Sequence, residues 1–467
     1  MKGSDSSKSP GPARTRGMRE IRAEGSPLNR QVLLPAERFI YSETISGALL
    51  LVCAIVALAW ANSPWSQSYF ALRDTPVSFQ IDTFSVALDL QHWINDGLMA
   101  IFFFVVALEI KRELVFGDLS DTRKAALPVA AAVGGMILPA GLYLALNFGG
   151  KGAAGWGIPM ATDIAFAVAI LALLGRRVPS QLRVFLLTFA IVDDVGSILV
   201  IAIYYTAHFS LPAMGLAIAI LGLMLAMRWL GFRSPLAYVF PAMIFWVAML
   251  ESGVHATIAG VILGAITPAK SPGRKSTFVE EVRETLPDVR DSPDRQDSER
   301  SEVMLGRIEE LVRQTESPLE RMERMLHPWT SYLVLPLFAL VNAGVTFSAE
   351  FTRQASTSAV TLGVILGLVV GKGVGVTAFA WLAVRLGWAA LPEGVAWRHI
   401  IGAGLIGGVG FTVSLFFTGL AFTETQLIEE AKAGVLAASL IAALGGYLFL
   451  LLVSRGSIPT GEKGNGA

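Results

Sequence analysis

The sequence has 467 residues, of which 53% are hydrophobic and only 16% are charged, and its formal net charge is zero. A soluble globular chain is usually about 25% charged, so this composition excludes an ordinary soluble protein and fits roughly a dozen membrane spans of about 20 residues each. The zero net charge predicts neither a nucleic acid nor an acidic partner, and the single cysteine, Cys53, excludes an intrachain disulfide.

The first 37 residues are rich in Ser, Gly, Pro and Arg and contain no apolar core followed by a small-residue cleavage site. We expect a disordered cytoplasmic tail over 1–37 rather than a signal peptide. The rest divides into membrane spans one to eight (38–269), a charged cytoplasmic insertion (270–318), membrane spans nine to twelve (319–454) and a cytoplasmic tail (455–467).

Apolar runs long enough to cross a membrane recur along the whole chain, and we expect an all-α polytopic membrane protein with about 12 transmembrane helices. The expected spans are residues 44–61, 93–110, 125–146, 155–174, 182–205, 212–227, 235–250, 254–266, 329–345, 360–386, 400–422 and 433–453. The eighth run is short enough to be a partial span.

Basic residues are distributed unequally between the two sides of this layout. With the N-terminus in the cytoplasm, the outer loops carry few cations, chiefly Arg73, Lys151, Arg353 and Lys432. The inner loops carry many more, namely Lys111, Arg112, Arg123, Lys124, Arg176, Arg177, Arg183, Arg228, Arg233, Arg385 and Arg398. Because Lys and Arg gather on cytoplasmic loops, we expect a multi-pass protein of the cell inner membrane with both termini in the cytoplasm.

Two connecting segments have distinctive patterns. Residues 75–90 alternate apolar and polar side chains around Val77, which predicts an external β-hairpin, with an ordered loop over the helix ends as the alternative. Residues 270–318 are highly charged and interrupted by prolines, and an apolar stripe at 303–312 favours an amphipathic helix. A tethered regulatory segment and a solvated linker are both compatible with this insertion.

Two adjacent aspartates, Asp193 and Asp194, fall in the middle of the fifth run, within A-I-V-D-D-V-G. An ionisable residue costs about 2.5–3.5 kcal/mol to insert at the centre of a membrane helix, so such residues are functional candidates. Neighbouring side chains on a helix diverge by about 100°, so the two carboxylates should face different surroundings. One would face an ion cavity while the other pairs with a cation; the alternative is a pair of structural, hydrogen-bonded aspartates.

The fourth and eleventh runs carry helix-breaking residues. The fourth contains the motif G-W-G-I-P-M-A-T-D, whose last two residues are Thr162 and Asp163. The eleventh contains G-L-I-G-G-V-G-F-T, from Gly404 to Thr412. Both patterns predict interrupted helices, which are tolerated at membrane depth only where they are buried in protein or line a cavity. Freed carbonyls there can coordinate Na+, although glycine runs also serve close helix packing.

Lys372 lies mid-way along the tenth run, in V-V-G-K-G-V-G. A lysine at that depth must pair with a carboxylate or lose its proton, and Asp193 or Asp163 is the obvious partner. A lysine whose head group reaches the membrane interface is the alternative.

The second run ends in L-E-I-K-R-E-L, which places Glu109, Arg112 and Glu113 on one helix face. Such clusters are usually solvated caps that contribute little, but at the mouth of a funnel they would gate transport or sense pH. His255 and His327 belong to the residue type that titrates nearest physiological pH, and we favour a structural hydrogen bond for each.

Six motifs occur in one order along the chain: W-I-N-D-G-L-M, L-E-I-K-R-E-L, A-T-D-I-A-F-A, I-V-D-D-V-G, G-V-H-A-T-I-A-G and G-G-V-G-F-T. Together they resemble the NhaA family of bacterial Na+/H+ antiporters over residues 43–452. The resemblance implies inverted repeats made of runs three to five and ten to twelve, with two interrupted helices crossing at mid-membrane. This family is itself a reference example of inverted repeats, so that architecture comes from the resemblance alone.

The resemblance also implies roles for residues near the interrupted helices. Asp194 matches the principal ion-binding carboxylate, and Asp193 matches the partner of Lys372. Thr162 and Asp163 match residues of the interrupted helix, with Asp163 compensating helix-end dipoles. A bound Na+ would then be held by Asp194, Asp163 and Thr162.

The family's cytoplasmic pH-sensing cluster is matched by Glu109, Arg112, Glu113 and Glu323, and we assign His255 to the same group. The long charged insertion and an arginine in place of a histidine before the H-P-W motif depart from the family pattern. These departures concern pH regulation rather than transport chemistry.

We therefore expect an electrogenic Na+(Li+)/H+ antiporter that extrudes sodium, is regulated by pH, has no enzymatic activity and needs no cofactor beyond the transported ions. The resemblance and the strand pattern together imply a homodimer formed through the 75–90 loop. A rival, an intramembrane aspartyl protease, lacks its usual Y-D and G-x-G-D settings, because Thr162 precedes Asp163 and Val192 precedes Asp193. A second rival, a sodium-coupled solute symporter, would need an organic substrate, for which the sequence has no pocket signature.

Overall fold

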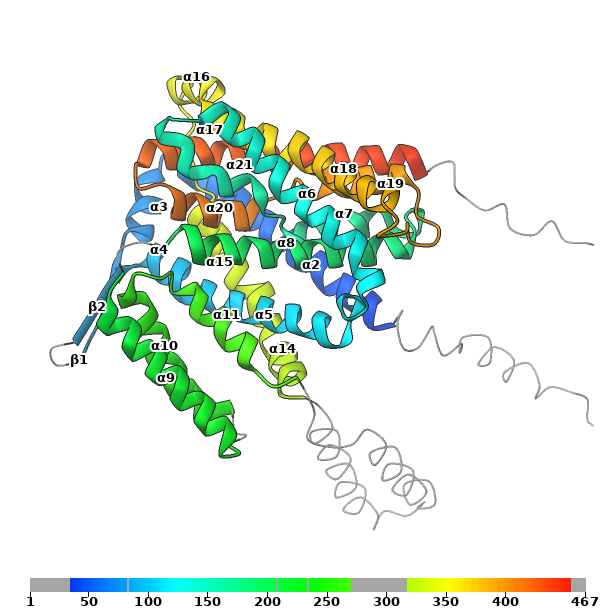
Figure 1. Cartoon of the computed structure of the whole chain (residues 1–467). Helices are drawn as coiled ribbons and strands as arrows, with labels where there is room; N and C mark the ends of the chain where they lie inside the picture. The colour runs from blue at the N-terminus through cyan, green and yellow to red at the C-terminus, as the bar shows by residue number, and fades with distance from the viewer. Residues whose placement is uncertain (1–33, 82–83, 207–208, 233–234, 270–316, 455–467) are drawn as a thin grey trace, which may run out of the picture.

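In a computed structural model of the chain, the described residues are 34–81, 84–206, 209–232, 235–269 and 317–454. Nearly all of them are helical, and the longer helices run side by side along one direction (Figure 1). The N-terminal tail before Leu34, the expected amphipathic helix of the insertion and the C-terminal tail after Ser454 lie outside the described residues.

Most of the elements are apolar helices, and short connections join most of them. Those of the first part are α2 (Leu34–Ala61), α3 (Ser66–Arg73), β1 (Pro76–Ile81), β2 (Phe84–Asp89), α4 (Leu90–His92), η2 (Trp93–Leu98), α5 (Met99–Phe116), η3 (Asp118–Ser120), α6 (Thr122–Asn147), η4 (Lys151–Met160), α7 (Ile164–Leu174), η5 (Gly175–Arg177) and α8 (Ser180–Tyr204). Those of the second part are α9 (Leu211–Trp229), α10 (Pro235–Ser252), α11 (Thr257–Ile266), α14 (Pro318–Trp329), η7 (Thr330–Val334), α15 (Leu335–Asn342), α16 (Ala349–Thr357), α17 (Ala359–Ile365), η8 (Leu366–Gly371), α18 (Lys372–Arg385), α19 (Trp397–Ile406), α20 (Phe411–Ala421) and α21 (Thr425–Ser454). Segments η2, η7 and η8 are π-helical, whereas η3, η4 and η5 are 3-10 helices.

Within the described residues, seven helices are long and apolar enough to cross a membrane. They cover Thr44–Ala61, Leu90–Phe116, Thr122–Asn147, Ser180–Tyr204, Leu211–Trp229, Ala359–Arg385 and Thr425–Ser454. Two further pairs, η4 with α7 and α19 with α20, pass the same test when taken together, but they bend by 43° and 49° at short breaks. The described part of the chain is thus helical apart from one hairpin and fits a polytopic protein, as the composition predicts.

Helices α2 and α14 begin close to two of the predicted domain boundaries. α2 begins at Leu34, so residues 34–37 are helical although the sequence placed them in the disordered tail. α14 begins at Pro318, because Ser317 and Glu320 form a capping box in which each side chain accepts the other's backbone N–H. Helix α14 thus begins at the last residue of the predicted insertion.

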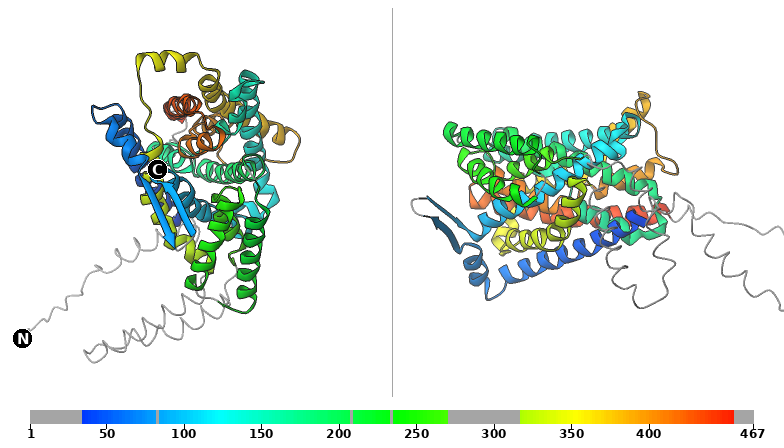
Figure 2. Two further views of the ribbon diagram at one scale, coloured as in Figure 1. Left: turned by 90° about the vertical axis from the view of Figure 1, so that its left-hand side faces the viewer. Right: turned by 90° about the horizontal axis from the view of Figure 1, so that it is seen from below.

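β1 and β2 form an antiparallel hairpin that projects from one end of the bundle (Figure 2). Its register pairs Pro76 with Asp89 and Ile81 with Phe84. The strand prediction for residues 75–90 is confirmed, and the ordered-loop alternative is wrong. We call the end of the bundle with α3, β1, β2 and α16 the hairpin end; the start of α2 and the end of α21 lie at the opposite, terminal end (Figure 1).

Helices α9 and α10 pair with each other and stand away from the rest of the bundle (Figure 1). Within α9 the buried residues are Ala217 and Met224, whereas large apolar side chains such as Leu216, Ile218 and Trp229 are exposed. A soluble monomer rarely exposes such a continuous apolar surface, and a helix surrounded by lipid does so as a rule.

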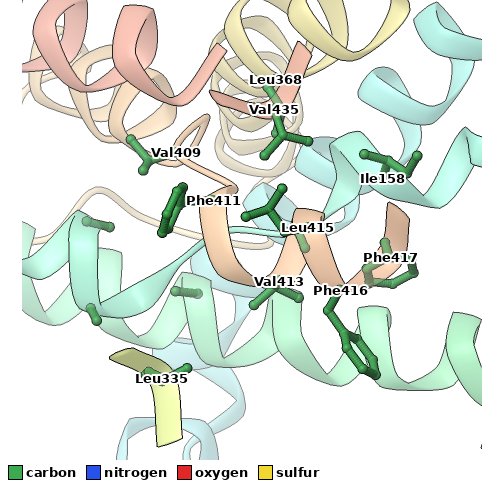
Figure 3. Packing of buried hydrophobic residues seen from close by; sticks show 14 of the residues in the cluster. Ile158, Leu335, Leu368, Val409, Phe411, Val413, Leu415, Phe416, Phe417 and Val435 are labelled. Atoms are coloured by element: carbon green, nitrogen blue, oxygen red, sulfur yellow. The ribbon is translucent and has the colours of Figure 1, made fainter. Parts of the chain in front are cut away.

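Helix α20 lies in the middle of the apolar core. Its residues from Phe411 to Thr418 are all buried. Figure 3 shows its side chains between apolar residues of four other elements, Ile158 of η4, Leu335 of α15, Leu368 of η8 and Val435 of α21. A helix buried all round is fixed by its neighbours, so the break that precedes α20 is held in one position.

Candidate ion-binding site

The breaks in the two bent helix pairs lie against each other. Residues 161–163 separate η4 from α7, and residues 407–410 separate α19 from α20. The Asp163 N–H donates a hydrogen bond to the Val409 carbonyl at 2.7 Å, and the Thr162 hydroxyl donates to the Gly407 carbonyl at 2.8 Å. Each break therefore satisfies backbone groups of the other, as the absence of water in a membrane interior requires.

The Asp163 carboxylate joins the two helices that leave the breaks. Its Oδ1 accepts the Phe166 N–H of α7 at 3.1 Å. Its Oδ2 accepts the Thr412 N–H of α20 at 3.1 Å and the Thr412 hydroxyl at 2.5 Å. A carboxylate at two helix N-termini caps orphan N–H groups and compensates both helix dipoles. This is the arrangement that the family resemblance implied for Asp163.

Glycines let the second bent pair approach its neighbours. A Cβ on Gly408, within the break, would lie 2.3 Å from the Leu368 carbonyl oxygen, which no side chain tolerates. A Cβ on Gly404 would lie 3.2 Å from the Gly373 carbonyl oxygen of α18. The glycine run of the eleventh predicted span therefore serves both purposes left open by the sequence, a break in the helix and close helix packing.

Asp193 and Lys372 form a buried ion pair between α8 and α18. Both side chains are fully buried, and Lys372 Nζ lies 2.6 Å from Asp193 Oδ2. The ammonium also lies 5.6 Å from the centre of the Phe189 ring. Of the two partners that the sequence allowed for Lys372, the structure selects Asp193, and the alternative of a lysine reaching the membrane interface is wrong.

Asp194 faces a different environment. It is 4% exposed, and its Oδ1 is buried without a hydrogen-bond partner among the described residues. Asp194 lines a cavity of about 50 Å³, together with Thr162, Asp163 and Thr412. A cavity of this size has room for a small ion with a few waters, because one water needs about 10–15 Å³ by the same measure.

The same cavity extends toward the charged cluster at the end of α5. Glu109 of α5 and His327 of α14 are part of its wall. Arg112 lies 4.0 Å from Glu109 and 3.6 Å from Glu113, and its guanidinium donates a hydrogen bond to Glu323 of α14. Burial raises the pKa of the Glu323 carboxyl, and the charge of Arg112 opposes this shift.

His255 is not brought together with this cluster. It precedes α11, whose Gly260 packs against Ala100 of α5, whereas Gly264 packs against Ala107. The two helices therefore run in the same direction, and His255 lies beyond the level of Ala100, which is already roughly 13 Å from Glu109 along the helix axis.

Sequence reasoning missed three hydroxyl-bearing residues of the cavity wall, Thr330, Ser331 and Thr412. Thr412 belongs to the quoted motif G-G-V-G-F-T, so its position beside the break was a usable signal. Thr330 and Ser331 directly follow H-P-W, and two adjacent polar residues at the start of an apolar run were the only signal for them.

Comparison with known proteins identifies the family that this chain resembles over most of its length. The family model described as Na+/H+ antiporter 1 matches residues 37–450. A protein of Oleidesulfovibrio alaskensis named Na+/H+ antiporter NhaA is 45% identical over 442 residues, which cover 94% of this chain and 98% of that protein. One from Sorangium cellulosum, named NhaA 2, is 46% identical and covers 89% of each chain.

A relative from Rhodopirellula baltica, named Na+/H+ antiporter NhaA, is 46% identical over 91% of this chain and 95% of that protein. The residues that the family model matches, 37–450, include both breaks. Because of its apolar helices, this chain is a multi-pass membrane protein. It belongs to the NhaA family of Na+/H+ antiporters, which are transporters rather than enzymes.

Proposed function

We propose that this protein extrudes Na+ or Li+ from the cytoplasm in exchange for protons, and that Asp194 alternately holds the cation and a proton. One observation carries the assignment: Asp194 Oδ1 is buried without a hydrogen-bond partner among the described residues, and Asp194 lines a cavity beside the two breaks. A carboxylate whose oxygens are not used by the protein is free to bind either ion. The family's name supports the choice of ions.

In the proposed cycle, a proton and Na+ compete for the same carboxylate oxygens. Na+ arriving from the cytoplasm displaces the proton from Asp194, while Asp163 and Thr162 offer further oxygens at the breaks. After the protein turns over, protons from outside displace Na+. Coupling requires that the empty, charged site does not turn over, because a bare buried carboxylate is costly to move through the membrane interior.

A flux measurement tests this function. The protein is reconstituted in vesicles with a pH-sensitive dye inside, a pH gradient is imposed, and NaCl or LiCl is added without any organic solute. We expect the internal pH to change on addition of either salt, and an unchanged pH would contradict the proposal. A change that requires an added solute would favour the symporter instead.

We further propose that the exchange is electrogenic, with more than one proton moved per Na+, as the family resemblance implies. Net positive charge then enters as Na+ leaves, and an inside-negative potential helps to drive the cycle. Potential-sensitive dye should respond during exchange; a flat signal at full exchange rate would mean that one proton moves per Na+. No cofactor is needed in this scheme.

We propose twelve spans with inverted repeats. Helices α10 and α11 and the η7–α15 segment, added to the seven long helices and the two bent pairs, give this number. Each proposed repeat, α6 to α8 and α17 to α21, has a bent pair between two straight spans, which supports interrupted helices crossing at mid-membrane. Accessibility of single cysteines along α11 tests the least certain span: a water-accessible middle would remove it from the count.

We propose that both termini and the 270–318 insertion are cytoplasmic, and that the membrane is the cell inner membrane. The distribution of Lys and Arg supports this orientation. A cysteine placed at Ser292 in a Cys53→Ser background should not react with an impermeant reagent added outside intact cells, and reaction there would reverse the orientation.

We propose a homodimer formed through the hairpin. A two-stranded sheet leaves one edge of each strand unpaired, and β1 and β2 project beyond the helices, where a second copy could add its strands. If dimers persist after deletion of residues 75–90 at equal protein concentration, the hairpin is not the contact.

We propose that the cluster of Glu109, Arg112, Glu113 and Glu323 senses pH at the cytoplasmic mouth of the cavity, with His255 as a separate titrating group. The Arg112 ion pairs with α5 and α14 support this, because protonation of Glu323 would release α14 from α5. A Glu323→Gln variant with an unchanged pH profile of exchange would rule the cluster out.

We propose that the membrane domain is formed by residues 38–269 and 319–454 together, and that the 270–318 insertion modulates exchange without taking part in the ion path. The insertion is too charged to enter the membrane. Excision should shift the pH profile of exchange, whereas complete loss of transport in a correctly inserted deletion would show that the insertion is part of the path.

A further inference from the structure

Part of the cavity wall beside Asp194 comes from the π-helical segment η7. Thr330 and Ser331 are its first two residues, and they are 3% and 4% exposed. Both line the cavity that Asp194 lines. Neither residue has a role in the proposed exchange cycle.

The π-helical turn has an identifiable cause. The Leu335 N–H donates to the Thr330 carbonyl, five residues earlier, and residue 336 is a proline, which has no N–H to give to the Ser331 carbonyl. The Ser46 hydroxyl of α2 donates to that carbonyl instead, at 2.9 Å, and Ser46 is fully buried. A contact between segments 285 residues apart therefore fixes η7 and the two hydroxyls it carries.

The Thr330 hydroxyl is prepared to act as an acceptor. It donates its hydrogen to the His327 carbonyl at 2.9 Å, within its own helix. A hydroxyl whose hydrogen is engaged in this way presents only lone pairs to other groups. Ser331, which also carries a hydroxyl, lines the same cavity.

A cation in this cavity needs more oxygens than the carboxylates offer. Both Asp163 oxygens already accept hydrogen bonds from α7 and α20, so Asp194 is the carboxylate with an unused oxygen. Hard cations take several oxygen ligands, and a site that strips their water must replace it with carbonyl, hydroxyl or carboxylate oxygens. Thr330 and Ser331 line the same cavity, and each carries a neutral hydroxyl oxygen.

We propose that Thr330 and Ser331 are ligands of the transported cation and contribute to its discrimination between Na+ and Li+. This inference rests on the proposed exchange and deepens it. The larger Na+ takes more ligands than Li+ and depends more on the two hydroxyls, whereas Li+ is held mainly by the carboxylate.

The test compares two double variants. Thr330→Val with Ser331→Ala removes both oxygens, and we expect the KM for Na+ to rise about three- to tenfold, the KM for Li+ to rise less, and the maximal rate to stay within about twofold. Thr330→Ser with Ser331→Thr keeps both oxygens and should keep the preference between the two ions. Thr377→Val is the matched control, because the Thr377 hydroxyl also donates to a carbonyl of its own helix, at 2.7 Å, but does not line the cavity.

Na+ binding to the purified protein, measured by calorimetry, separates this inference from the proposed function. If the wild-type protein exchanges the ions and the first double variant keeps the wild-type Na+ KM and ion preference, the inference is overturned and the function stands. Wild-type protein that binds Na+ without exchanging it would overturn the function, and the inference would then stand or fall on whether the variant binds Na+ more weakly than the control.

Discussion

The two sides of α8 that carry Asp193 and Asp194 differ in how each carboxylate is satisfied. On the paired side, Asp193 Oδ2 meets Lys372 Nζ at 2.6 Å, and both side chains are fully buried. On the open side, Asp194 Oδ1 has no hydrogen-bond partner among the described residues, and Asp194 lines a cavity. Two identical residues that follow each other in sequence thus have opposite circumstances.

Position on the helix, not residue type, therefore decides which aspartate pairs with Lys372 and which lines the cavity. A turn of about 100° moves the side chain from the α18 contact to the cavity. An acid that is neutralised by a fixed cation has little reason to bind another ion, whereas an acid without a fixed partner must bind a proton or a cation to be neutral. Substitutions at the two acids should therefore have different effects on transport and on stability.

Replacement of the open-side acid should have the largest effect on transport. Asp194→Asn keeps the shape but removes the charge that attracts Na+ and the group that carries a proton, so exchange should fall to background and calorimetric Na+ binding should vanish. Its thermal stability should be unchanged or higher, because a buried carboxyl without a partner is removed. Substantial Na+-driven proton flux in this variant would contradict the assignment.

Replacement of the paired-side acid should act mainly on stability. Asp193→Asn leaves Lys372 without its partner, and breaking a buried pair costs about 3–5 kcal/mol. Some Na+ binding should remain, with altered electrogenicity. Lys372→Met should partly rescue the stability loss, because it removes the orphaned charge.

A double-mutant cycle on thermal unfolding measures the coupling in this pair. Strong coupling between Asp193 and Lys372, with Na+ binding retained in Asp193→Asn, would support the comparison. Additive stability effects, together with equal loss of Na+ binding in both aspartate variants, would overturn it.

Asp163 is an intermediate case, since it lines the cavity but both its oxygens accept hydrogen bonds from the protein. Asp163→Asn must turn its amide N–H₂ toward either the Phe166 N–H or the Thr412 N–H, which leaves a buried donor unsatisfied at a cost of about 1–3 kcal/mol. We expect lower thermal stability with weakened, not abolished, Na+ binding. Thr412→Val, which removes one bond to the same oxygen, should cost less, and a larger loss there would place the main interaction elsewhere.

Much of the site was predictable because its signals are local. Each polar group buried in an apolar run, such as Asp193, Asp194 or Lys372, is visible in the sequence, and the divergence of adjacent side chains follows from helix geometry. The glycines of residues 404–410 predicted the break before α20, and the resemblance narrowed the partners of Lys372 to Asp193.

The unpredicted parts depend on contacts between distant segments. The bond from Ser46 to the Ser331 carbonyl joins residues 285 positions apart, and nothing near either residue points to the other. Ser317 and Glu320 have the spacing of a capping box, which predicts the start of α14. The charge of the neighbouring residues led us to assign this segment to the insertion instead. Local charge and long-range packing were thus the two sources of error.

The smallest expected effect comes from the contact that holds the wall of the open side. Ser46→Ala leaves the Ser331 carbonyl without the Ser46 hydroxyl, and the proline at residue 336 has no N–H to replace it in the π-helical pattern, so the variant should lose about 1 kcal/mol of stability. If this bond positions η7, the Na+ KM should also rise, by about twofold or less. Ser252→Ala is the matched control, because that serine is equally buried and its hydroxyl donates at 2.7 Å to the Met249 carbonyl, away from the cavity. The control should lose stability without a change in Na+ KM. A Ser46→Ala variant that matches the control in both measurements would show that the open side does not depend on the position of η7.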